Sequence, residues 1–83
     1  MTDIPDQAAL REALADAAAS HHDYEAVYLK GVRDSQWSGY YAAFVLGRLG
    51  GFAPASVLAT CLEAAEGADW ATAASDLVID RLG

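Results

Sequence analysis

The chain has 83 residues, of which 54% are hydrophobic, and its twelve acidic and five basic side chains give a net charge of −7. One domain is expected at this length, with a small core and little surplus stability. The five basic residues are scattered along the chain. Binding to nucleic acids or to anionic membranes is therefore not expected, because both need a dense cationic surface.

The first ten residues, MTDIPDQAAL, lack the basic and apolar regions of a secretion signal, and this predicts a cytoplasmic location. The single cysteine, Cys61, allows no intramolecular disulfide and fits the same compartment. No segment has the spacing of a catalytic or cofactor motif. We therefore expect neither enzymatic activity nor a cofactor.

The spacing of apolar residues predicts two helices in the first part of the chain. The first runs from about Pro5 to Ser20, with the proline in its first turn. The second is short and runs from about Tyr24 to Arg33, with Ser20 or Asp23 as its N-cap. The residues between them are expected to form a polar link.

The third predicted helix is the most apolar segment, and Asp34 or Ser35 is its expected N-cap while Gly50 ends it. One broad stripe consists of Trp37, Tyr40, Tyr41, Phe44, Val45 and Leu49. A helix that is also apolar on its other side must be covered there, either by the rest of the chain or by another molecule. In the second case the predicted interface consists of Gly39, Ala42, Ala43 and Leu46.

Two more helices complete the prediction. The fourth begins at Pro54 and ends at Gly67, and the fifth runs from Trp70 to Leu82 with Asp69 as its N-cap. No segment alternates apolar and polar residues over enough positions to predict a strand.

An internal repeat links the later helices. Residues 37–50 align with residues 70–83, and five of the fourteen positions are identical. Extended upstream, the repeat covers 24–50 and 57–83, each interpreted as a helix–turn–helix hairpin. We therefore predict an all-α fold in which residues 1–83 form a single compact domain, a five-helix bundle made of one N-terminal helix and two repeated hairpins.

Potential metal ligands gather only in the segment HHDYE, from His21 to Glu25. No second cluster is present to complete a coordination shell, so we expect no metal site. Cys61 lies on the apolar stripe of its helix, where a thiol acts as a small hydrophobic side chain.

The tyrosines offer another candidate site. Tyr24, Tyr28, Tyr40 and Tyr41 are the residues that would surround a small cavity beside Trp37. Tyrosine and tryptophan also fill cores with their polar atoms at the edge, and they are enriched at protein interfaces. We take core or interface as the main interpretation.

These observations predict a small acidic helical module for protein–protein interaction, which binds a larger protein or forms a homodimer. Two alternatives stay open. One is a ligand-binding or enzymatic bundle that uses the Tyr/Trp cluster with His21 or His22. The other is an acidic inhibitor that mimics a nucleic acid. An exposed apolar face would favour the interaction module. A concave pocket lined by Tyr and His would favour the ligand-binding or enzymatic bundle, and a surface array of carboxylates would favour the inhibitor.

Overall fold

The computed structural model describes residues 4–30 and 36–82, which form helices and no strand. The helices are α1 (Gln7–Val27), α2 (Trp37–Leu49), α3 (Ala55–Ala64) and α4 (Trp70–Leu82). The prediction of an all-α fold is confirmed. The predicted number of helices is wrong, since the described residues form four where five were expected.

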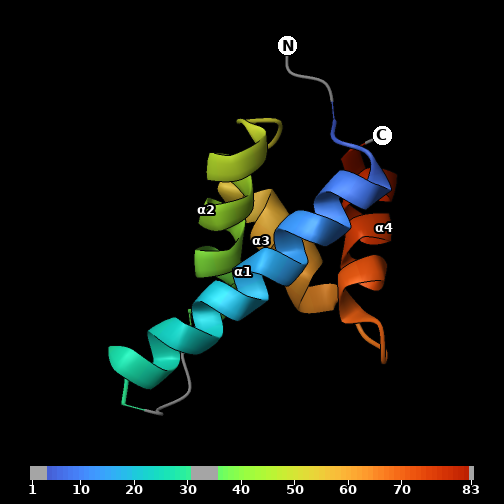
Figure 1. Ribbon diagram of the computed structural model, residues 1–83. Coiled ribbons are helices and arrows are strands. Elements are labelled where there is room, and N and C mark those ends of the chain that lie inside the picture. The colour runs from blue at the N-terminus through green and yellow to red at the C-terminus, as the bar shows by residue number, and fades with distance from the viewer. Residues whose placement is uncertain (1–3, 31–35, 83) are drawn as a thin grey trace.

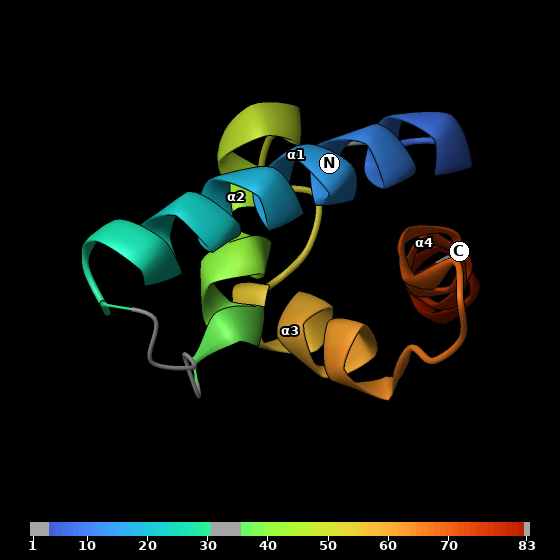
Figure 2. The ribbon, with the colours of Figure 1, turned by 60° about the horizontal axis from the view of Figure 1, so that its bottom comes forward.

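The four helices form a ring. The backbone of α1 packs against α2 and α4, and that of α3 packs against the same two helices. Among the described helices, neither α1 and α3 nor α2 and α4 bring their backbones together. Figure 1 shows α1 crossing diagonally between α2 and α4, and Figure 2 shows the ring from another direction, with α4 seen nearly end-on. The radius of gyration, 12.3 Å, is that of a compact domain.

α1 replaces the two helices that were expected from Pro5 to Ser20 and from Tyr24 to Arg33. It starts after Asp6, whose side chain accepts a hydrogen bond of 2.8 Å from the backbone N–H of Ala9. It then continues through the residues that were expected to form a polar link. Residues 31–33 of the second expected helix, and the cap candidates Asp34 and Ser35, lie outside the described residues.

The residues of the polar segment and their contacts explain why α1 continues through this segment. The segment contains neither glycine nor proline, so nothing in it forces the helix to end. The Ser20 hydroxyl forms a 2.6 Å hydrogen bond with the hydroxyl of Tyr40, and Nδ1 of His21 lies 3.4 Å from Oε1 of Glu25, one turn later on the same helix. Ser20 therefore acts in packing against α2 instead of as an N-cap.

The core lies inside the ring and is built from few large side chains. α1 contributes a stripe at helical spacing that consists of Leu10, Ala13, Leu14, Ala17 and His21. The other helices contribute Ala42, Val45, Leu58, Cys61, Leu62, Ala74 and Val78. The alanines let neighbouring helices approach closely. At the rim, Arg48 of α2 pairs with Asp16 of α1, and Gln7 of α1 donates to Asp76 of α4 at 2.5 Å.

The two repeated helices have matching bounds. α2 and α4 both have 13 residues, begin with tryptophan and are followed by glycine in the sequence. Gly50 ends α2 with a φ of +92°, a conformation that glycine adopts without strain. The upstream halves of the repeat differ, because residues 24–27 are the last turn of α1 whereas α3 is a separate helix.

α4 begins at the N-cap that its sequence predicted. The Asp69 carboxylate accepts hydrogen bonds from the backbone N–H of Thr72 at 3.3 Å and from its hydroxyl at 2.7 Å. These bonds, first the one from the hydroxyl and then the one from the N–H, hold the pKa of Asp69 below its usual value.

A proline substitution tests the continuity of α1. His22 is exposed in the middle of the helix, so His22→Pro removes a helical hydrogen bond without disturbing the core. We expect it to lower the free energy of unfolding by about 3 kcal/mol relative to the control His22→Ala, measured by urea denaturation. A link between two helices at this position would tolerate the proline, and equal stability of the two variants would contradict a continuous α1.

The N-cap of α4 predicts a pH dependence. Because the folded-state pKa of Asp69 is lowered, its contribution to stability is present above the unfolded pKa of about 4 and is lost as the pH falls through the folded pKa. Asp69→Asn keeps a good N-cap but does not titrate. We expect wild type to lose stability relative to this variant below about pH 4, measured as unfolding free energy against pH. Parallel pH profiles would rule out this role of the carboxylate.

Candidate functional site

Seven aromatic rings form one continuous row along one end of the ring of helices. Together they are called the aromatic row, and they are His21, Tyr24, Tyr28, Trp37, Tyr40, Tyr41 and Trp70. α1 and the residue that follows it supply the first three, α2 supplies the next three and α4 supplies the last. The structure thus brings together the four tyrosines and the tryptophan that the sequence suggested as a candidate site.

The inner part of the row joins α2 to α4. Trp37 and Trp70, the first residues of their helices, meet edge to face with ring centroids 5.8 Å apart. Tyr41 packs edge-on against both, at 5.4 Å from Trp37 and 5.5 Å from Trp70. The indole N–H of Trp70 donates to the backbone carbonyl of Leu62 at 3.3 Å. Both tryptophans are partly buried against the core, and they connect two helices whose backbones do not touch.

The middle of the row is a buried histidine between tyrosines. His21 is 5% exposed, and its ring meets those of Tyr40 at 4.9 Å and Tyr41 at 5.2 Å, both in tilted edge contacts. Burial, followed by the nearby Glu25 carboxylate and Tyr40, raises the pKa of Tyr41 above its ordinary value. The Tyr41 phenol therefore keeps its proton at neutral pH. These contacts hold the C-terminal half of α1 against α2.

The outer part of the row reaches solvent. The ring of Tyr24 lies 5.2 Å from that of Tyr40 and 5.6 Å from that of Tyr28. Tyr28 is 75% exposed and the neighbouring Val27 is 67% exposed. Tyr24, Val27, Tyr28 and Tyr40 are called the tyrosine surface from here on.

The sequence did not indicate that Val27 and Tyr28 are exposed. All three of Tyr24, Val27 and Tyr28 fall in the short helix predicted from about Tyr24 to Arg33. In the structure these residues form the last turn of α1 and its C-cap, beyond the part of the helix that the core covers. The absence of glycine and proline from Gln7 to Leu29 was the available signal for one long helix.

The residues predicted as an interface on α2 do not share one environment. Ala42 is fully buried in the chain's own core, and Leu46 is partly buried against it. Gly39 and Ala43 are exposed, and a Cβ at Gly39 would have no neighbour within 4 Å. The chain therefore covers part of the predicted face and leaves the rest open. Binding of a partner to Gly39 and Ala43 remains a prediction.

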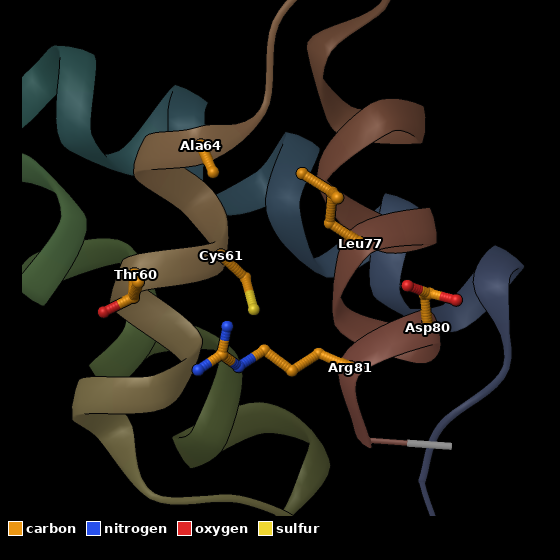
Figure 3. Close-up of a pocket in the computed structure, with 6 residues that line it drawn as sticks. All are labelled: Thr60, Cys61, Ala64, Leu77, Asp80 and Arg81. Atoms are coloured by element: carbon orange, nitrogen blue, oxygen red, sulfur yellow. The ribbon is translucent and has the colours of Figure 1, made fainter.

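A small open pocket lies between α3 and α4. Its volume is about 230 Å³, and it is lined by Thr60, Cys61, Ala64, Leu77, Asp80 and Arg81. Figure 3 shows the Cys61 sulfur and the Arg81 guanidinium pointing toward each other across it. It contains no residue of the aromatic row, so it is not the pocket of Tyr and His that the ligand-binding alternative requires.

The two adjacent histidines have different environments in the structure. His21 is buried in the aromatic row, whereas His22 is exposed on the surface of α1. Within residues 4–30 and 36–82, no three His, Cys, Asp or Glu side chains are grouped so that they could hold a metal ion. None of the helices in these ranges combines the length and the hydropathy needed to cross a membrane.

Comparisons with known proteins found no match to the chain. No family model matches the chain, and searches of curated proteins and of solved structures found no significant match.

Substitutions of Trp70 test the inner part of the row. Trp70→Ala removes contacts with two aromatic rings, and since the indole is partly buried we expect the unfolding free energy to fall by about 3 kcal/mol, the lower end for core aromatics. Trp70→Phe keeps a ring and loses the bond to Leu62, which should cost about 1 kcal/mol. Urea denaturation measures both. An alanine variant as stable as wild type would show that the ring contacts contribute nothing.

Proposed function

We propose that the chain is a small acidic module for protein–protein interaction and that the tyrosine surface is where its partner binds. The exposure of Val27 and Tyr28 at the end of α1 carries this proposal. Only three large hydrophobic side chains of the described residues are exposed, and two of them are these neighbours. Tyrosine is enriched at protein interfaces because its ring offers a large contact area and its hydroxyl can bond at the edge.

Two residues of the tyrosine surface, Tyr24 and Tyr40, are held in place before any partner arrives. Tyr40 is fixed by its hydrogen bond with Ser20 and by its contact with His21, and Tyr24 packs on Tyr40. Side chains that are already ordered lose little conformational entropy when they bind. A rigid aromatic anchor of this kind is typical of the residues that dominate binding energy at interfaces.

An uncharged strip on α2 adjoins the tyrosine surface. Gly39, Ala43 and Gly47 are exposed at helical spacing, and Tyr40 is one turn from Ala43 on the same helix. Small uncharged residues cost little to desolvate and let a partner backbone approach closely. Two of the residues predicted from the sequence, Gly39 and Ala43, therefore extend the proposed binding surface.

The proposed module binds either a different protein or a second copy of itself. Its single cysteine is buried and forms no disulfide, which fits a cytoplasmic location.

A double variant tests the proposed function. Val27→Ser with Tyr28→Ser removes the exposed hydrophobic side chains and, because both are on the surface, should change the unfolding free energy by less than about 0.5 kcal/mol each. Leu77→Ser is the control away from the tyrosine surface, since Leu77 is the third exposed hydrophobic residue, at 37% exposure, and lies on α4. Cross-linking in the source cell and sedimentation of the purified chain measure partner binding and self-association.

We expect wild type and Leu77→Ser to form the same complex, and the double variant to lose it. A complex that all three chains form equally would place the binding site elsewhere. A chain that stays monomeric and forms no complex in the cell would contradict the proposed function.

A further inference from the structure

We infer that the segment of the partner that contacts the tyrosine surface is basic and presents arginine side chains to the tyrosine rings. This inference rests on the proposed function and names the chemistry of its partner. It follows from the charge of the chain and from the geometry of the exposed rings.

The net charge favours a basic partner over a second copy of the chain. Two copies would each carry −7, and bringing them together would add repulsion to the cost of association. A basic segment is attracted by the same charge, which also speeds its encounter with the surface. Beside the tyrosine surface, Asp23 is exposed next to Tyr24 and one turn before Val27 on α1. Lys30 is the one described basic residue close by in sequence, two positions after Tyr28.

The ring geometry favours arginine as the basic residue. The planes of Tyr28 and Tyr40 are each inclined by 33° to the plane of Tyr24, so these two ring pairs are tilted and not edge to face. Tyr28 is mostly exposed, which leaves a face of its ring accessible. A planar guanidinium stacks on such a face through cation–π attraction and can still bond in its own plane to a carboxylate. An exposed carboxylate, that of Asp23, is next to Tyr24 in the sequence and can accept that second bond.

Lysine fits this surface less well. Its ammonium is compact and strongly hydrated, so it gives up more hydration to reach a ring face and cannot stack as a plane. Net charge alone would not distinguish lysine from arginine. A preference for arginine is therefore the signature of recognition by the rings.

The experiment uses the full chain and two synthetic peptides, one of alternating glycine and arginine and one of alternating glycine and lysine. Binding is measured by fluorescence anisotropy of the labelled peptides at about 150 mM salt, where charges farther apart than about 8 Å are largely screened. We expect the arginine peptide to bind more tightly by about twofold or more.

Substitutions locate the binding on the chain. Tyr28→Ala should weaken the arginine peptide by about two- to fivefold, whereas Tyr28→Phe, which keeps the ring, should bind as wild type does. Asp23→Asn should weaken binding more than Asp69→Asn, because both remove one negative charge but only Asp23 lies beside the tyrosine surface. Equal binding of the two peptides, or no effect of Tyr28→Ala, would overturn the inference and leave only non-specific attraction by the net charge.

The inference and the proposed function can fail separately. If the arginine peptide does not bind, but a complex in the cell or a dimer still depends on Val27 and Tyr28, the basic partner is wrong and the proposed function stands. If neither the peptide nor any protein depends on these residues, both are wrong.

Discussion

The packing of Tyr40 and Tyr41 on His21 is the contact on which the arrangement of the four helices depends. It buries the imidazole ring of His21, which lies in the C-terminal half of α1. The same contact fixes the pairing of the C-terminal half of α1 with the N-terminal half of α2. The last turn of α1 then extends past its neighbours, and this leaves Val27 and Tyr28 in solvent.

The core shows how a short chain closes a ring of helices. Alanine occupies buried positions on α1, α2 and α4, so the helices approach closely and few large side chains are needed between them. Large side chains gather instead at one end, where the rings of Trp37, Tyr41 and Trp70 connect α2 to α4. The contact between α3 and α4 is less extensive than those between the other neighbouring helices, and the small pocket with Cys61 and Arg81 lies between these two helices.

Local signals in the sequence predicted the presence of α2, α3 and α4, although α3 ends at Ala64, before the predicted end at Gly67. The start of α4 follows from Asp69 and the end of α2 follows from Gly50, because caps and glycines act within one turn. α1 was predicted wrongly because the same local reasoning was applied to Ser20 and Asp23. A residue that suits an N-cap also fits inside a helix when a tertiary contact occupies its side chain, and the hydroxyl of Tyr40 does this for Ser20.

The candidate site could be predicted only in part, for a related reason. Which tyrosines come together follows from their helical spacing, but which of them reach solvent depends on where neighbouring helices end. The face of α2 with Gly39, Ala42, Ala43 and Leu46 shows the same limit. One helical wheel groups these residues, whereas the positions of α1 and α3 bury Ala42 and leave Gly39 and Ala43 open.

The exposure of Val27 and Tyr28 has an energetic meaning for so small a domain. Burying a large hydrophobic side chain contributes about 1.5–3 kcal/mol, a substantial part of the stability that a chain of this length can reach. The free chain gains only a minor part of this contribution from either residue, although the adjoining Tyr24 and Tyr40 pack on each other beside them. A partner that covered the proposed tyrosine surface would gain it instead, and if it bound the folded chain alone it would also stabilise the last turn of α1. Under the proposed function, binding and folding at this end of the molecule would thus be linked through the same side chains.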